Sequence, residues 1–430
     1  MPRPTILILS QVYVPDPASV GQHIADAAAE LVKRGYDVKV YAAANGYDDP
    51  SKQYAKREML DGVEVVRLPF SSFGKSSIAA RLLGQSLFVM QAFFRSLLVE
   101  DLAGIMVSTS PPFCGVVGAI LSKLRGVPVK YWLMDLNPDQ MIAMKKISAT
   151  SLQARVFDFF NRVILRQASD IVVMDRFMLD RIAVKGVPVR EKTVASPPWP
   201  HEEETQRIAH GDNPFRQKHG LGGDNREKFV VMYSGNHSPA NPLKTLLDAA
   251  ERMKDEKRLV LYCIGGGGGK KEVDDRIAVG AKNIVSLPYQ PFKEIKYSLS
   301  AADVHVVSIG DDVVGIVHPC KVYGAMAVSR PVLLLGPNPS HVSDIIEKYK
   351  IGWHVSHGDV DGCVRVLQEM LNTSPEQFAE MGKRAAEVIS TKLSKKTLCG
   401  DFCDVITRGL PAAPARGKAE HAGAGHAGAH

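Results

Sequence analysis

The sequence predicts an α/β protein built from two facing, Rossmann-like, doubly wound domains. The first observation is length, because 430 residues exceed what one ordinary hydrophobic core organises. The second is a repeated alternation of short apolar segments with longer helical ones, which is typical of parallel sheets covered on both faces. The third is residues 196–212, rich in proline and charge, which separate two such series and indicate a linker.

The first series opens with an apolar strand at residues 5–14 and a helix at 21–36 that ends near Gly35. Glycine is favoured just after a helix because it adopts positive φ without strain. The further strands expected in this series are 37–43, 63–69, 104–111, 127–135 and 170–175, with a helix at 152–168.

The second series predicts a similar sheet and sets the expected boundaries. Its strands are expected at 228–235, 258–265, 283–289, 303–309, 331–336 and 351–355. The chain therefore divides into a first domain (1–195), the linker (196–212) and a second domain (213–393).

Two segments follow the second domain. Residues 394–410 predict a helix with one apolar stripe, and we expect it to cross back to the first domain. The low-complexity residues 411–430 are expected to be disordered. The stripe consists of Leu398, Phe402, Val405 and Ile406.

Composition and charge narrow the class of protein. Hydrophobic residues make up 45% of the chain and charged residues 23%, which are globular values. The net charge is +7, and residues 1–195 hold 24 Lys and Arg against 18 Asp and Glu. Such a basic half favours anionic lipid or a phosphate-bearing acceptor, although a solvated surface explains it equally well. No basic run with interleaved aromatic residues occurs, which argues against a nucleic-acid partner.

The expected location is cytoplasmic. The start of the chain does not resemble a signal peptide, and no uncharged apolar run reaches the roughly 18 residues of a membrane span. The six cysteines are scattered, which fits reduced thiols. The helical segment 77–100 is apolar, with Phe88, Phe93 and Phe94. A buried core helix is the default interpretation, and peripheral contact with the inner face of a membrane is the sharper alternative.

Ligands of open α/β sheets bind at the carboxyl ends of strands, which selects three loops. In residues 15–23, Gly21 allows backbone to approach an anion, with Asp16 and His23 beside it. Residues 264–271 are rich in glycine, including Gly265 and Gly266, but match neither a P-loop nor GxGxxG.

The third loop leads into a helix within residues 315–336. Gly315, His318 and Pro319 precede Lys321, which is expected in the first helical turn. Asp135, at the end of another strand, is expected near the cleft edge, and capping of a loop is its alternative role.

Several segments together resemble the retaining glycosyltransferases of the GT-B fold, in the branch that contains bacterial polysaccharide and lipopolysaccharide sugar transferases. In the second half these are residues 233–250, 287–308 and 318–333, with the glycine-rich turn after 264. In the first half they are residues 11–43 and 131–139. The resemblance covers roughly residues 5–410.

The resemblance implies a hexosyltransferase-type reaction with a nucleotide-sugar as co-substrate. It places the donor on the second domain and a surface-polysaccharide, glycolipid or related acceptor, lipid-linked forms included, on the first. It calls for no metal and no other cofactor. The residues expected to be catalytic are Asp135 and Lys321, and those expected on the acceptor side are Asp16 and His23; the expected donor-binding set is Gly21, Ser234, Gly235, Asn236, His237, Gly265, Gly266, Tyr289, Gly315, His318 and Pro319.

The chain departs from the family where charged donor contacts are usual. Asn236 and Asn241 stand where most relatives have Arg and Lys, and Ile316 and Gly324 stand where they have Glu. Lys321 is then the expected replacement cation. Because of these departures two alternatives stay open, a non-catalytic transferase-like subunit and a nucleotide-sugar epimerase or hydrolase of the same architecture.

Overall fold

A computed structural model describes residues 2–46, 49–73, 78–200, 207–222 and 227–414. The chain forms two compact units. The first unit holds residues 1–132, 163–170 and 402–430, and the second holds 133–162 and 171–401. The disordered tail expected at 411–430 lies outside the described residues from 415 onward, and so does part of the expected linker, 201–206.

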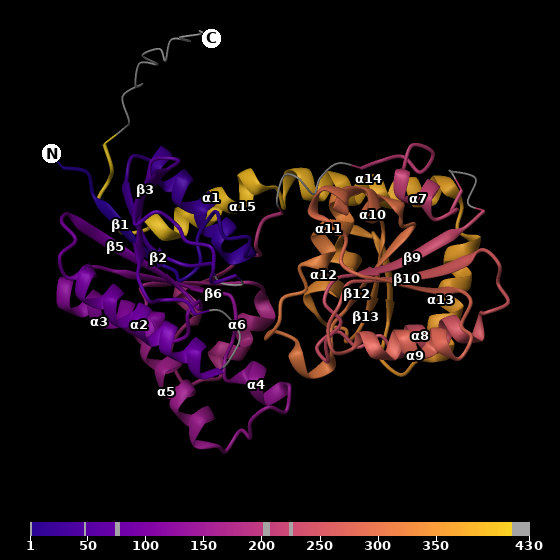
Figure 1. The fold of residues 1–430 in the computed structure, drawn as a ribbon, viewed down its shortest axis with the longest axis horizontal. Coiled ribbons are helices and arrows are strands. Elements are labelled where there is room, and N and C mark those ends of the chain that lie inside the picture. The colour runs from indigo at the N-terminus through magenta and orange to yellow at the C-terminus, as the bar shows by residue number, and fades with distance from the viewer. Residues whose placement is uncertain (1, 47–48, 74–77, 201–206, 223–226, 415–430) are drawn as a thin grey trace, which may run out of the picture. The chain divides into compact units, whose positions relative to one another are not determined.

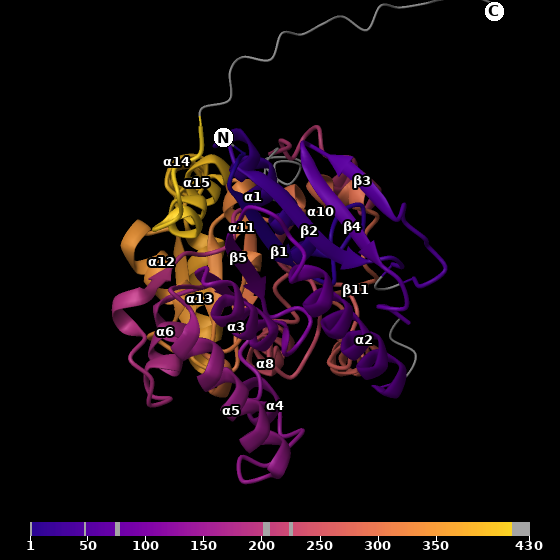
Figure 2. The same ribbon diagram turned by 90° about the vertical axis from the view of Figure 1, so that its left-hand side faces the viewer.

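The first sheet has eight strands in the order β3-β4-β2-β1-β5-β6-β7-β8. β1 pairs in parallel with β2 and β5, whereas β3 is antiparallel to β4 at one edge (Figure 2). The short strands β3 and β8 are additions to the series that the sequence predicted. The strands are β1 (Thr5–Leu9), β2 (Asp37–Ala43), β3 (Arg57–Leu60), β4 (Val63–Leu68), β5 (Leu102–Ser108), β6 (Val129–Leu133), β7 (Asp170–Val173) and β8 (Thr193–Ala195).

Helices follow the strands of this first series. In α1 the residues Ile24, Ala27, Leu31 and Val32 are buried at helical spacing, and Gly35 (φ 96°) lies just beyond the helix end. The helices are α1 (Ser19–Lys33), α2 (Ile78–Ser96), α3 (Cys114–Arg125), α4 (Asp139–Ala143), α5 (Leu152–Gln167) and α6 (Arg176–Ala183).

The second sheet has six strands in the order β11-β10-β9-β12-β13-β14, all paired in parallel. The order reverses between β9 and β12, and such a switch point opens a crevice at the strands' carboxyl ends. The strands are β9 (Phe229–Ser234), β10 (Leu259–Ile264), β11 (Ile284–Leu287), β12 (Val304–Ser308), β13 (Val332–Leu335) and β14 (Gly352–Val355).

Helices flank this sheet (Figure 1), and alternate residues of its strands pack into two different cores. Leu333 and Leu335 of β13 join the core under α8 and α13, whereas Val332 and Leu334 join the core under α11, α12 and α14. The helices are α7 (Pro214–Lys218), α8 (Lys244–Arg252), α9 (Lys270–Ala278), α10 (Ile295–Ala301), α11 (Lys321–Ala327), α12 (His341–Tyr349), α13 (Val360–Asn372), α14 (Pro375–Thr391) and α15 (Lys395–Thr407).

The carboxy-terminal end of α15 packs within the first unit. The rings of Phe402 and Trp132 lie 4.4 Å apart. Lys130, 2% exposed, donates to Asp170 (2.5 Å) and to the carbonyl of Arg408 (2.5 Å). A buried ion pair therefore anchors the end of the described chain to β6 and β7.

Candidate functional site

Two glycine-bearing turns meet at the carboxyl ends of β9 and β10. Gly235 and Gly265 have φ values of 140° and 128°, a conformation that favours glycine. A Cβ on Gly265 would overlap the carbonyl of Gly235, and one on Gly267 would overlap the carbonyl of His237. The predicted glycine-rich loop therefore exists, and its glycines first serve close packing of the two turns.

Lys321 lies directly over Gly235. A Cβ on Gly235 would overlap Cε of Lys321, and the Lys321 ammonium stands 5.3 Å from the centre of the Tyr233 ring. Burial lowers the pKa of Lys321 below the ordinary lysine value. Within the described part of the chain no carboxylate forms an ion pair with Lys321. Lys321 is thus a half-buried cation over Gly235 that pairs with no carboxylate of the described residues.

His237 supports the turn from beneath. Its side chain is 1% exposed, and its Nδ1 lies 3.1 Å from the carbonyl of Gly235, a spacing that suits donation to that carbonyl. Burial first, and then the charge of Lys270, lowers the pKa of His237 to about 4, so the ring is neutral. Its Nε2 is buried without a hydrogen-bond partner among the described residues.

The other predicted donor-side residues of this region differ in their exposure. Tyr289 is 60% exposed, and its ring lies beside Gly266. The carbonyl of Asn236 accepts from the Tyr233 hydroxyl (2.6 Å), and Asn241 donates to Ser238 (2.9 Å). Ser234, the last residue of β9, is half-buried.

The loop between β12 and α11, residues 309–320, is held by α6. Arg181 donates to the carbonyl of Val314 (3.0 Å). Gly315 (φ 71°) touches the backbone of Phe177, where a Cβ would leave no room. These contacts lie within the second unit and fix the 309–320 loop in front of Lys321.

A buried hydrogen-bonded chain completes this hold. His318 Nδ1 lies 2.8 Å from Asp175 Oδ2, His318 Nε2 lies 2.7 Å from the Tyr323 hydroxyl, and that hydroxyl lies 2.8 Å from His341 Nε2. Asp175 also caps α6, accepting from the amide of Met178 (2.9 Å).

Ligand atoms of Asp175, His318 and His341 all lie within 4.8 Å of one another, as in a metal centre. Ligands around a tetrahedral zinc would be about 3.3 Å apart, given Zn–N bonds of about 2.0–2.1 Å. Asp175 and His318 are only 2.8 Å apart, closer than two ligands of one zinc, and the Nε2 atoms of His318 and His341 each contact the Tyr323 hydroxyl, at 2.7 and 2.8 Å. Hydrogen bonds account for this group.

Sequence reasoning selected His318 but missed Asp175, Tyr323 and His341. Asp175 had a usable signal, because it ends the apolar segment 170–175 just as Asp135 ends 127–135. Tyr323 and His341 had none, since only the packing of α11 against α12 and the loop brings them to His318.

Asp135 follows β6 and keeps its side chain open to solvent. The protein atoms around it nevertheless desolvate the carboxyl enough to raise its pKa. Asp135 belongs to the second unit, as Lys321 does.

The three residues predicted in the first loop belong to the first unit and take part in its packing. Gly21 lies against the backbone of Tyr13, where a Cβ would be 3.1 Å from the Tyr13 Cα. Asp16 is 3% exposed and accepts from the amide of Ala18 (3.1 Å). His23 is 5% exposed, with its Nδ1 2.8 Å from the carbonyl of Ser19.

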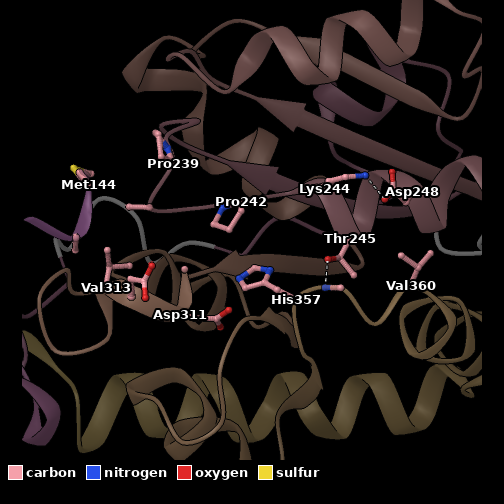
Figure 3. Close-up of a pocket in the computed structure, with 15 residues that line it drawn as sticks. Met144, Pro239, Pro242, Lys244, Thr245, Asp248, Asp311, Val313, His357 and Val360 are labelled. Atoms are coloured by element: carbon pink, nitrogen blue, oxygen red, sulfur yellow. Dashed lines mark hydrogen bonds and ion pairs between the residues drawn. The ribbon is translucent and has the colours of Figure 1, made fainter. Parts of the chain in front are cut away.

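A hollow of about 540 Å³ opens between the loop after β9, the 309–320 loop and the turn before α13 (Figure 3). Asp311, Asp312 and Asp248 line it, and among the described lining residues Lys244 alone is a lysine or arginine; it pairs with Asp248 (2.7 Å). Its apolar wall includes Met144. The excess of carboxylates disfavours a phosphate there, in contrast to the surroundings of Lys321.

Two family models match the chain in succession. The glycosyl transferase 4-like domain matches residues 19–199, and the glycosyl transferases group 1 domain matches residues 215–388. Among curated proteins, WcaI of Escherichia coli (strain K12), whose name assigns it to colanic acid biosynthesis as a glycosyl transferase, is 24% identical over 397 residues. That alignment covers 87% of this chain and 95% of WcaI. WbjE of Pseudomonas aeruginosa, named as a glycosyltransferase, is 23% identical over 310 residues, covering 70% and 74%.

Solved structures show the same fold. WaaG, a glycosyltransferase involved in lipopolysaccharide biosynthesis, has a TM-score of 0.66 at 15% identity, covering 94% of this chain and all of its own. HepE of Anabaena, in complex with UDP and glucose, has a TM-score of 0.67 at 17% identity, covering 94% and 99%. The predicted GT-B fold is thereby confirmed. With a glycosyl transferase 4-like domain over residues 19–199 followed by a glycosyl transferases group 1 domain over residues 215–388, the chain is a glycosyltransferase.

Proposed function

We propose that this glycosyltransferase moves a sugar from a nucleotide-sugar, with retention of anomeric configuration, to a precursor of a surface polysaccharide or glycolipid. The observation that carries the donor side of the proposal is the half-buried Lys321 over Gly235. A cation held in a dehydrated position without a carboxylate is suited to a diphosphate, and charge-assisted hydrogen bonds are the strong ones. The structure of HepE with UDP and glucose supports a nucleotide-sugar as the donor class.

In this proposal Lys321 neutralises the charge that develops on the departing nucleoside diphosphate. Such preorganised electrostatic stabilisation needs no metal, and a metal-free reaction remains our prediction. The close contact of Lys321 with Gly235 places the ammonium beside the backbone of this turn, and the exposed Tyr289 ring offers a face for the base. The acceptor attacks the face that the leaving group departs from, which retains the configuration. Asp135 is the proposed catalytic carboxylate beside the reacting sugar.

The acceptor class rests on the relatives. WcaI is named for colanic acid biosynthesis, and WaaG is involved in lipopolysaccharide biosynthesis. We propose an acceptor of the same kind, presented at a membrane surface. Asp16 and His23 remain the predicted acceptor side and Gly21 a predicted donor contact, although in the structure their side chains or backbone serve internal packing. No helix in the described part of the chain is long and apolar enough to cross a membrane.

The test is a transfer assay with a panel of nucleotide-sugars and membrane glycolipid extracts as acceptor. We expect free nucleoside diphosphate to accumulate only with acceptor and one donor class, and the new linkage to keep the donor's anomeric configuration by NMR. Hydrolysis at the same rate without acceptor would favour the hydrolase alternative. Failure of every donor to bind would favour the non-catalytic subunit.

A further inference from the structure

The hydrogen atoms of the hydrogen-bonded chain Asp175–His318–Tyr323–His341 can be placed in two arrangements. Burial lowers the pKa of His341 to about 3, so this ring is neutral. Burial by itself raises the pKa of Asp175, but the hydrogen bond with His318 and the nearby imidazoles bring it below the ordinary value. Asp175 is therefore a carboxylate that accepts from His318 Nδ1.

With His318 neutral, the Tyr323 hydroxyl donates to His318 Nε2 and accepts from His341 Nε2. With His318 protonated, His318 Nε2 donates to the Tyr323 oxygen, and the hydroxyl donates to His341 Nε2, which then carries its proton on Nδ1. The three contacts among Asp175, His318, Tyr323 and His341 are kept in both arrangements. Only a hydroxyl, which donates and accepts at once, permits this exchange.

Two ionisable groups outside this hydrogen-bonded chain act on its members, Asp344 on His341 and Cys320 on Tyr323. Asp344 on α12 pairs with Arg176 on α6 at 2.6 Å. Cys320 is exposed, at the end of the loop. Asp175 and His318 have side chains only 4% exposed. This hydrogen-bonded chain is thus shielded from solvent where it joins α6 to the 309–320 loop.

We propose that the Tyr323 hydroxyl is a positioning group that locks the 309–320 loop between α6 and α12 and thereby places Lys321 over Gly235. His318 precedes Lys321 by three residues, so movement of the loop would carry the cation with it. The inference rests on the proposed donor site for its effect on nucleotide binding, but its effect on the loop is independent of any ligand.

The first measurement is hydrogen exchange of the loop amides followed by mass spectrometry. Tyr323→Phe keeps the ring and leaves two histidine Nε2 atoms without a partner, so exchange in residues 309–320 should accelerate about tenfold or more. Tyr41→Phe is the matched control, because Tyr41 is also buried (5% exposed) and its hydroxyl donates to the carbonyl of Arg95 (3.2 Å) in the first unit. Equal exchange in both variants would overturn the proposal.

The second measurement is calorimetric titration with UDP, GDP and ADP. For the nucleotide that binds the wild type, we expect Tyr323→Phe to lower the affinity about tenfold. Tyr41→Phe should leave that affinity unchanged. His341→Gln, whose amide still offers an N–H to the Tyr323 oxygen, should rescue loop protection and affinity where His341→Ala does not. Accelerated loop exchange with no nucleotide binding even by the wild type would support the positioning role and contradict the donor site.

Titration with zinc separates the hydrogen-bonded chain from a metal centre. Stoichiometric zinc binding by the wild type, abolished in His341→Ala, would overturn the positioning proposal in favour of a metal site. Absence of zinc binding, together with the exchange result above, would support it.

Discussion

At the scale of single residues, Lys321 combines a cost to folding with a use in binding. Burial without a carboxylate lowers its pKa, so the folded state binds the lysine proton less tightly than the unfolded chain does. Below the folded pKa the full penalty is present, and it is relieved as pH rises from the folded pKa to the unfolded one. Functional sites are where such unfavourable charges persist.

Replacement of Lys321 by Met keeps the apolar stem and removes the charge. We expect transfer to fall about ten- to a hundredfold, as for the loss of one charge-assisted contact, while the free energy of unfolding at pH 7 stays equal or rises. Initial rates and urea unfolding check the two halves. Lys254→Met, at an exposed position, is the control and should change neither.

The pH dependence gives a second check on the same residue. Nucleotide affinity of the wild type should decline with rising pH before the ordinary lysine range is reached, since the cation is lost at the lowered pKa. An arginine at position 321 stays charged throughout. A Lys321→Arg variant that shows the same decline would refute the assignment to this side chain.

At the scale of elements, α2 is neither wholly buried nor wholly exposed. Phe88 and Ala92 face the core, each 0% exposed, whereas Leu83, Phe94 and the following Leu98 are 55%, 61% and 82% exposed. α2 packs against α3, which adds an exposed Leu124 (Figure 1). The interpretation of 77–100 as a buried core helix therefore holds for one face of α2 only. The opposite face forms an apolar surface suited to a membrane interface.

The α2 surface should bind vesicles that contain anionic lipid. We expect the protein to sediment with vesicles that contain phosphatidylglycerol. This binding should weaken but persist as salt is raised, because apolar insertion is not screened. Leu83→Ser with Phe94→Ser should release the protein. Met59→Ser, at another exposed apolar residue (64%) of the same unit, is the control. Protein that stays in the supernatant with all vesicles would end this proposal.

At the scale of the whole molecule, the chain returns from the second unit to the first through α15. The return is anchored by the buried pair Lys130–Asp170, with Arg408 3.2 Å from the same carboxylate. A second pair, Arg34–Asp404 (2.6 Å), lies at the surface, where Asp404 is 70% exposed.

The two pairs should differ sharply in what they contribute to stability. Asp170→Asn leaves the Lys130 ammonium buried without its carboxylate, so the free energy of unfolding of the first unit should fall by about 3–5 kcal/mol. Asp404→Asn should cost at most about 1 kcal/mol, as expected for an exposed pair. Urea unfolding measures both, and equal losses would contradict the assignment of the anchor to Lys130–Asp170.

The fold class, the series of strands and the loops in which a site could lie were all predictable from the sequence. They follow from periodicity and from glycine and proline positions, which are local properties of the chain. The strand expected at 5–14 is shorter in the structure, where it spans Thr5–Leu9. Lys321 could also be selected from the sequence, because Asn236 and Asn241 stand where most relatives have Arg and Lys.

Which polar residues meet depends instead on tertiary packing. The fold buries His237 under the Gly235 turn, places His23 and Asp16 in the packing of the first unit, and brings Asp175, Tyr323 and His341 to His318. Successive partners in that hydrogen-bonded chain are separated by 143, 5 and 18 positions in the sequence. No local pattern encodes such a meeting, because hydrogen-bond partners are set by how helices pack on the sheet and not by spacing along the backbone.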